Sequence, residues 1–303
     1  MPSSGLGNSF DSEYRKCQRK FYYGTRLGLA LQSARVAPPL LIGEAIHKYA
    51  ETFLKAWMAG SRDKDTVKAE SLGEFNTIVG TPDPELDIDL LEREQLARAV
   101  LPFWAERKWE RLAAGAETPL AVEVAYAMPL PADTDYGPIR AELRTYTVKI
   151  DYVFTKAGGL NCVCDHKGTG ALSLAQESLH YLMSDQHLGY VFVWNWANPS
   201  QLADTLMYDM MRLHAKVTSP HAFHVEERNV DLGAQLDDWY QRMLYVRAEL
   251  SNKWDQPPVA WISNTVPHGP CLSYGRACEF TPLCKRPSDV ELLMETKYRT
   301  EAP

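Results

Sequence analysis

Apolar and polar residues alternate most clearly between Val148 and Gly170. The first part, V-K-I-D-Y-V-F-T, is rich in β-branched and aromatic residues, and the run K-A-G-G after it supplies turn residues. The second part, N-C-V-C-D-H-K, alternates again. This pattern predicts a β-hairpin.

Three residues of this hairpin are of the kind that enzymes use in catalysis. Asp151 lies in the first arm, and the two-residue period of the second arm turns Asp165 and Lys167 to the same face. A carboxylate beside an ammonium group is often only a surface ion pair. Here both residues lie in or at the end of an apolar strand, a second acid lies on the partner strand, and Gly168-Thr169-Gly170 follows. These features favour a functional site.

The spacing of apolar residues predicts the elements around the hairpin. We expect helices over residues 9–23, 40–57, 86–112, 173–197 and 236–250, and strands over residues 119–131 and within 203–230. Ser9 or Ser12 could cap the first helix, which Gly24 would end.

Four further polar residues in these elements allow two interpretations each. His47 lies next to the apolar stripe of the second helix, where a lone histidine is more often a core residue than a ligand. Glu123, in the strand nearest the hairpin, could support a metal, but an ordinary strand carboxylate is the more frequent case. Gln186 and Tyr190 stand four residues apart and share a helix face, a pairing that is common by chance.

The composition is that of an ordinary soluble globular protein, with 303 residues, 45% of them hydrophobic and 23% charged. The formal charge of -7 argues against a protein that coats nucleic acid through bulk electrostatics. No apolar run approaches the roughly 18 residues of a membrane span, and no signal segment is recognisable. We therefore expect no membrane partner and a cytoplasmic location.

A basic and aromatic segment near the N-terminus is the candidate for a local phosphate-binding surface. Residues 1–60 hold eight Lys/Arg against four Asp/Glu, a balance of +4 that leaves -11 for the remainder. Interleaved cations and aromatic rings suit single-stranded nucleic acid, although a solvated helix face with aromatic core anchors is an equal alternative. The candidate DNA-binding residues are Arg15, Lys16, Arg19, Lys20 and Tyr22.

The six cysteines fall into two groups by context. Disulfides are the less frequent use of cysteine in a cytosolic chain, so ligands or buried thiols are expected. Cys162 and Cys164 share one strand face and are predicted to be small core residues. Three others lie in a loop-like segment, C-L-S-Y-G-R-A-C-E-F-T-P-L-C, where core packing is not expected; they are Cys271, Cys278 and Cys284. Cys17 lies alone near the N-terminus.

In their order along the chain, these motifs resemble the RecB-type branch of the PD-(D/E)XK nuclease superfamily, especially its iron–sulfur members such as CRISPR-adaptation exonucleases. The motifs are G-E-A-I-H at 43–47, I-D at 150–151, D-H-K at 165–167 and Q-x3-Y at 186–190. The resemblance runs from Ser9 to Cys284, and it implies a bacterium or a phage-infected host cell as the setting. It implies an α/β fold with a restriction-endonuclease-like core, in which helices flank a mixed central β-sheet.

The resemblance also implies how the chain is divided. Residues 1–60 would form a helical segment with the first cluster cysteine and the histidine motif, and 61–118 a helical insertion. Residues 119–256 would form the nuclease core, and 257–303 a cysteine-cluster segment packed on it, all within one integrated domain.

The family's chemistry can be carried over to matching positions. His47, Asp151, Asp165 and the backbone carbonyl of His166 would hold Mg²⁺ or Mn²⁺. Lys167 would orient or deprotonate the attacking water, or stabilise charge at phosphorus. Gln186 and Tyr190 would position the scissile strand or hold Lys167.

The one-plus-three cysteine arrangement is similar to the family's split cluster. Cys17, Cys271, Cys278 and Cys284 would bind a [4Fe-4S] cluster that acts as a structural clasp between the ends of the chain. Thiolates are soft ligands, and four of them are equally compatible with a tetrahedral zinc ion. The last three cysteines are spaced C-x6-C-x5-C, where C-x2-C-x5-C is more usual, and Gln18 stands where a proline often follows the first.

The predicted function is that of a metal-dependent DNA exonuclease acting on single strands or ends. One alternative is a structure-specific endonuclease with the same active centre, and another is a catalytically weak DNA-binding module on the same fold. The partner is DNA, with a helicase or recombination protein needed wherever duplex must be opened. Serine hydrolases and P-loop ATPases are not supported, because neither G-x-S-x-G nor G-x4-G-K-[ST] occurs.

Overall fold

The computed structural model describes residues 6–31, 37–83, 85–170, 173–174, 176–177, 185–213, 222–257, 260–261, 278–285 and 290–300. Two compact units are recognisable, each assembled from separate stretches of the chain. The first comprises Met1–Arg35, Ala127–Thr147 and Tyr240–Pro303, and the second Val36–Tyr126 and Val148–Trp239. The bounds of these units differ from those of the four segments expected from the sequence, and the division into four segments stays a prediction.

The second unit is built on a five-stranded sheet with the order β2-β5-β6-β7-β8. Its strands are β2 (Glu117–Pro129), β5 (Thr145–Lys156), β6 (Asn161–Thr169), β7 (Ala203–Arg212) and β8 (Phe223–Asn229). Strand β6 pairs antiparallel with β5 and parallel with β7, and β7 pairs antiparallel with β8. The predicted α/β fold with a mixed central sheet is therefore confirmed.

The predicted hairpin is formed by β5 and β6. Tyr152 pairs with Cys164 and Phe154 with Cys162, while the turn contains Gly159 at a φ of 82°. A positive φ suits glycine, which explains the turn sequence. The residues next along this register are Asp151 and Asp165, so the hairpin brings the two acids of the sequence motif to neighbouring positions.

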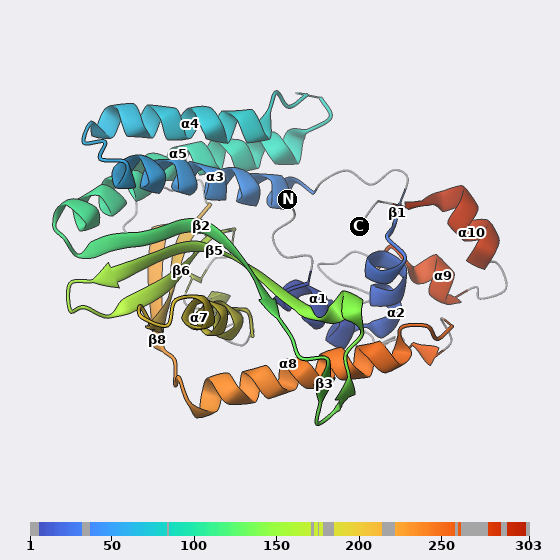
Figure 1. Ribbon diagram of the computed structural model, residues 1–303. Coiled ribbons are helices and arrows are strands. Elements are labelled where there is room, and N and C mark those ends of the chain that lie inside the picture. The colour runs from blue at the N-terminus through green and yellow to red at the C-terminus, as the bar shows by residue number, and fades with distance from the viewer. Residues whose placement is uncertain are drawn as a thin grey trace. The chain divides into compact units, whose positions relative to one another are not determined.

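Helices flank the sheet on both faces (Figure 1). One face is covered by α3 (Pro38–Met58) and α5 (Ile88–Ala113), with α4 (Lys64–Val79) packed on the outer side of α3, and α7 (Gln186–Ala197) lies on the other face. Two prolines in the first turn begin α3, where their missing N–H groups leave no bond unmade. Helix α7 occupies the crossover that the parallel pair β6 and β7 requires. The beginning of the helix predicted from Ser173 lies largely outside the described residues.

The core of this unit lies between the sheet and the layer of α3, α4 and α5. The predicted apolar stripe of α3 contributes to it, as do Cys162 and Cys164, whose prediction as core residues is confirmed. Burial raises the pKa of the Cys162 thiol to about 12, which disfavours a thiolate ligand there. Large buried side chains from helices and strands complete this core: Tyr49, Phe53, Phe75, Trp104, Tyr152 and Phe154.

In the first unit, the N-terminal helix is interrupted, contrary to the prediction of one helix from Ser9 or Ser12 to Gly24. Helix α1 (Asn8–Lys16) stops at Cys17, whose backbone is extended, with φ -158° and ψ 102°. The Cys17 sulfur then accepts the Lys20 N–H at 3.5 Å and caps α2 (Gln18–Phe21). A π-helical turn, Tyr22–Arg26, follows. The hydrogen bond to the Cys17 sulfur thus starts a new helix at the point where apolar spacing predicted that the first helix would continue.

The ends of the chain come together within the first unit. Strand β1 (Leu29–Leu31) pairs antiparallel with β9 (Tyr298–Thr300), which follows α9 (Thr281–Lys285) and α10 (Val290–Lys297). The Gly24 backbone lies so close to the Phe280 ring that a Cβ there would approach it to 3.1 Å. Backbone pairing and aromatic packing therefore hold the two ends side by side.

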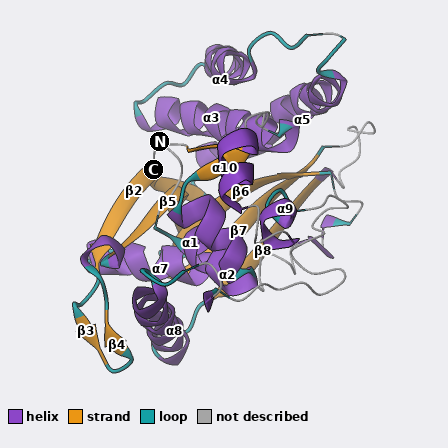
Figure 2. Cartoon of the chain, turned by 90° about the vertical axis from the view of Figure 1, so that its right-hand side faces the viewer, coloured by secondary structure: helices purple, strands orange, loops and turns teal. Residues whose placement is uncertain are grey.

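The remaining elements of the described chain are few. Helix α8 (Ala234–Lys253) corresponds to the helix predicted over residues 236–250. Strands β3 (Asp133–Thr134) and β4 (Gly137–Pro138) form a small hairpin, seen at the lower left of Figure 2, and a short 3-10 helix spans Ala141–Leu143. None of the described helices combines the length and the apolar character that a membrane span requires.

Candidate metal centre

Three potential ligands from three elements of the second unit meet at one point: His47 of α3, Glu123 of β2 and Asp151 of β5. The His47 Nδ1 atom lies 3.2 Å from Asp151 Oδ2 and 4.0 Å from Glu123 Oε1. One ligand atom of each residue lies within 4.8 Å of the others. Two carboxylates and an imidazole at this spacing fit a single divalent cation.

His47 reaches this point because it borders the buried stripe of α3. Its neighbour Ile46 is 1% exposed, whereas the His47 side chain is 30% exposed. Burial lowers the pKa of His47, but the Asp151 carboxylate outweighs this and raises it above the ordinary value. The imidazole is therefore held against Asp151 rather than packed as an ordinary core residue.

Glu123 has an unusual backbone for a strand residue. Among the described residues it is the one non-glycine position with a positive φ, 52°. The side chain is 4% exposed and pairs with Lys149. Burial and then the nearby Asp151 raise the pKa of Glu123, although Lys149 and His47 oppose this. Backbone strain that turns a carboxylate toward other acids is typical of functional sites.

Asp165 and Lys167 adjoin this group on β6. Asp165 is 1% exposed, and the Lys167 Nζ atom lies 2.8 Å from its Oδ2 atom. The backbone N–H of His166 donates to Asp151 Oδ2 at 2.9 Å. The two acids and the lysine of the sequence motif are thus brought together.

The two aspartates have different electrostatic environments. Burial raises the pKa of Asp165 to about 6, and the nearby Asp151 adds to this, while Lys167 opposes it. Burial also disfavours ionisation of Asp151, but His47 and Lys167 outweigh it and hold the pKa of Asp151 below its ordinary value. Two buried acids this close repel each other when both are ionised, and a bound cation would relieve that repulsion.

Gln186 and Tyr190 share a face of α7, as their spacing predicts. The Gln186 Nε2 group donates to the Tyr190 hydroxyl at 2.5 Å. Their roles toward Lys167 or a substrate strand, and that of the His166 carbonyl, stay predictions.

The basic N-terminal segment is only partly as expected. Arg15 and Lys16 are exposed, and Arg19 and Lys20 are half-buried. Tyr22 is 8% exposed, and its ring packs against Trp261 with centroids 5.2 Å apart. This burial favours the aromatic core anchor that the sequence also allowed, and DNA contact by Tyr22 stays a prediction. DNA contact by the four basic residues stays a prediction.

The predicted cluster cysteines are described only in part. Cys271 lies outside the described residues. Cys17 is buried, and Cys278 and Cys284 are half-buried. Among the described residues, these three do not form a group as tight as that of His47, Glu123 and Asp151.

Glu123 is the site residue to which sequence reasoning gave too little weight. Its side chain meets the histidine and the hairpin acid through the φ of 52°, which no residue pattern reveals. The available signal was a lone carboxylate on the strand expected beside the catalytic hairpin.

Comparison with known proteins places the chain in a family. The model of the PD-(D/E)XK nuclease superfamily matches residues 12–285. A search of curated proteins finds none that matches the sequence.

Solved structures give only distant likenesses. A crystal structure of a candidate exonuclease from Eubacterium rectale is 10% identical, with a TM-score of 0.45, covering 90% of this chain and 89% of that one. A protein named SSO0001 is 9% identical, with a TM-score of 0.30, covering 71% of this chain and 89% of that one. At these scores neither likeness supports an argument about function.

Proposed function

Because the chain belongs to the PD-(D/E)XK nuclease superfamily, we propose that it is a metal-dependent deoxyribonuclease, acting as an exonuclease on single-stranded DNA or on DNA ends. One observation carries this proposal. The hairpin and α3 bring His47, Asp151, Asp165 and Lys167 together, each from its own motif in the sequence. A degenerate binding module would have little need to keep all four.

The ligand set suits a hard divalent cation. Within one close group, Glu123 and Asp151 offer carboxylate oxygens and His47 offers a nitrogen, which favours acceptance of Mn²⁺ beside Mg²⁺. We add Asp165 of β6, which adjoins this group, as a further carboxylate ligand. We assign the backbone carbonyl of His166 as a further ligand. The bound cation would lower the pKa of a water molecule and neutralise charge on the phosphate under attack.

The protein's own groups would orient the reactants. We assign to the Lys167 ammonium, which pairs with the Asp165 carboxylate, a hydrogen bond to the attacking water or to a phosphate oxygen. The hydrogen bond between Gln186 and Tyr190 fixes the tyrosine hydroxyl on its helix face. To this pair we assign the positioning of the scissile strand.

A [4Fe-4S] cluster held by Cys17, Cys271, Cys278 and Cys284 is the second part of the proposal. Burial and then the neighbouring Cys284 raise the pKa of Tyr23, so this cysteine lies close to a residue six positions after Cys17. Burial raises the pKa of Tyr298 to about 12, with contributions from Cys278 and Cys284. Cys284 thus lies close to Tyr23 near the N-terminus and to Tyr298 of β9, and the pairing of β1 with β9 joins these two parts of the chain. We assign the cluster a structural role there.

Digestion of labelled DNA tests the function. Linear single strands labelled at either end, and a circular single strand of the same sequence, are incubated with Mg²⁺ or Mn²⁺. We expect stepwise release of nucleotides from the linear strands and no cut in the circle. Cleavage of the circle would instead support the endonuclease alternative. No cleavage of any substrate, with binding intact, would leave only a DNA-binding module.

A further inference from the structure

His166 occupies the middle of the D-H-K motif, but its side chain lies on the face of β6 opposite to Asp165 and Lys167. The ring is 1% exposed. Tyr152 stacks on it at a centroid distance of 6.1 Å and an interplanar angle of 16°, and Trp104 meets it edge-on at 5.4 Å. Two aromatic contacts therefore fix this ring inside the core.

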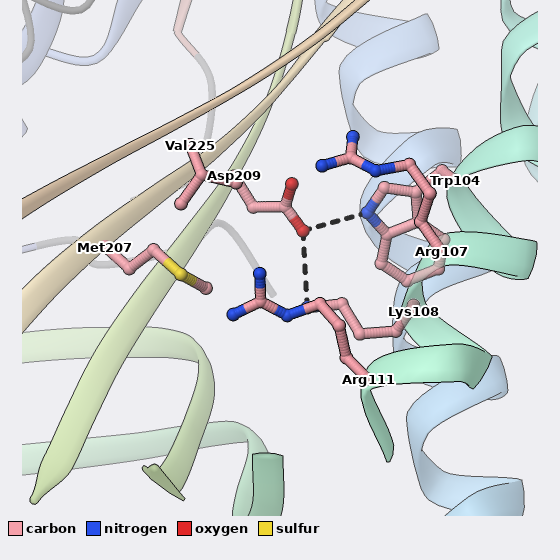
Figure 3. A pocket seen from close by; sticks show the side chains of 7 residues that line it. All are labelled: Trp104, Arg107, Lys108, Arg111, Met207, Asp209 and Val225. Carbon is pink, nitrogen blue, oxygen red and sulfur yellow. Dashed lines mark hydrogen bonds and ion pairs between the residues drawn. The ribbon is translucent and has the colours of Figure 1, made fainter. Parts of the chain in front are cut away.

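A buried carboxylate on the neighbouring strand lies beside the same ring. Asp209 pairs with His166 in the parallel ladder, and its Oδ2 atom lies 3.5 Å from the His166 Nδ1 atom. The same oxygen accepts the Trp104 Nε1–H at 3.0 Å and lies 3.3 Å from Lys108 Nζ. Figure 3 shows Trp104 and Lys108 converging on this carboxylate.

The charges in this network depend on one another. Lys108 is 2% exposed and also pairs with Glu117, 3.1 Å away. Burial disfavours the charged form of Asp209, but Lys108 and His166 outweigh it and hold its pKa below the ordinary value. An ionised group at such depth persists only while its partners stay in place. The network is therefore a rigid support rather than a set of exchangeable surface pairs.

The His166 backbone connects this polar network to the candidate metal centre. The backbone N–H of His166 donates to Asp151 Oδ2, so the orientation of this one peptide sets the orientation of a metal-ligating carboxylate. The His166 ring is attached to the same Cα atom as this N–H group. Fixing the ring on one face of the strand therefore limits rotation of the His166 backbone.

We propose that Asp209 is a positioning residue for the metal centre, acting through the His166 side chain and its backbone N–H on Asp151. This inference rests on the proposed function only in taking Asp151 as a metal ligand. It adds a residue outside the sequence motifs, on a neighbouring strand, to those on which metal binding depends. Partners that orient metal ligands typically affect metal affinity by about 10- to 100-fold.

The test is a calorimetric titration of the full-length protein with Mn²⁺, without DNA. Asp209→Asn keeps the size of the side chain and an acceptor for Trp104, but removes the negative charge. We expect the Mn²⁺ dissociation constant to rise about tenfold or more. His166→Phe, which keeps a ring but removes its nitrogen atoms, should give a similar rise. The double variant should add little to either, because both act along one path.

Loss of stability alone is controlled by Val67→Ala in α4, a fully buried apolar site of the same core that takes no part in the polar contacts named above. If Asp209→Asn folds poorly, Asp209→Asn combined with Lys108→Met removes both charges of this buried pair, and Arg111 remains as the partner of Glu117. An unchanged dissociation constant in the folded Asp209 variants, or an equal rise in Val67→Ala, would overturn the inference. Tight Mn²⁺ binding by the parent protein without any DNA cleavage would instead count against the proposed function alone.

Discussion

Replacement of Glu123 should reveal how much backbone strain the metal centre stores. At a φ of 52°, a side chain with a Cβ costs roughly 1–2 kcal/mol. Glycine has no such cost, but it loses about 0.5–1 kcal/mol through the greater freedom of the unfolded chain. The difference predicts that Glu123→Gly is more stable than Glu123→Ala by about 0.5–1 kcal/mol.

An ordinary position of the same strand provides the control. Ala121 also lies in β2 and is not among the described residues with positive φ. There, Ala121→Gly should lower the free energy of unfolding by about 0.5–1 kcal/mol, the opposite sign. Urea denaturation of the metal-free proteins measures all of these changes. If glycine is no better than alanine at position 123, the strain argument is wrong.

The Glu123 carboxylate itself is tested by adding Mn²⁺. A ligand at about 100 times its dissociation constant stabilises the folded state by about 2.7 kcal/mol. Glu123→Gln, which keeps the shape and removes the charge, should gain clearly less than the parent protein at the same Mn²⁺ concentration. An equal gain would show that Glu123 is not a ligand.

Three further predictions concern the surroundings of the site. His47→Ala should raise the Mn²⁺ concentration for half-maximal cleavage about tenfold or more, with the thermal midpoint nearly unchanged; a collapse in stability with an unchanged metal requirement would make His47 a core residue. Gly168→Ala should reduce both stability and cleavage, because the new Cβ would lie 2.7 Å from Ile46 Cδ1; adding Ile46→Val should restore both, and failure to do so in denaturation and cleavage assays would refute this contact. Alkylation at pH 8 followed by mass spectrometry should label half-buried Cys284 in the cluster-free folded protein but not Cys164, whose pKa is raised by complete burial; rapid labelling of Cys164 would contradict its place in the core.

Most of the second unit could be predicted because its elements follow simple periods. The alternation of apolar and polar residues around Asp151 and Asp165 predicted the hairpin, and the register of the hairpin follows from its short glycine turn. The stripe of α3 placed His47 at the edge of the core. These features depend on local patterns, which a single sequence contains.

Other parts depended on interactions that no local pattern contains. The break at Cys17 comes from a side chain that caps the next helix, and Tyr22 is buried by Trp261, far away in the sequence. In the sequence, Asp209 is a single acid within the apolar run L-M-Y-D-M-M, and Lys108 is one of several charged residues in a long helical segment. Only the packing of α5 on β7 makes them partners.

The variant Asp165→Asn tests most directly whether this site cleaves DNA with a bound metal. The substitution keeps the shape of a side chain that is 1% exposed and removes its charge. Asp204→Asn is the matched control, since Asp204 lies on β7 and its side chain, among the interactions described, accepts only the hydroxyl of the neighbouring Thr205. The assay measures cleavage of labelled single-stranded DNA in Mn²⁺, together with DNA binding by the same proteins. We predict that Asp165→Asn loses nearly all cleavage while it still binds DNA, and that Asp204→Asn retains both. Cleavage by Asp165→Asn at the rate of the parent protein would contradict the assignment of the active centre.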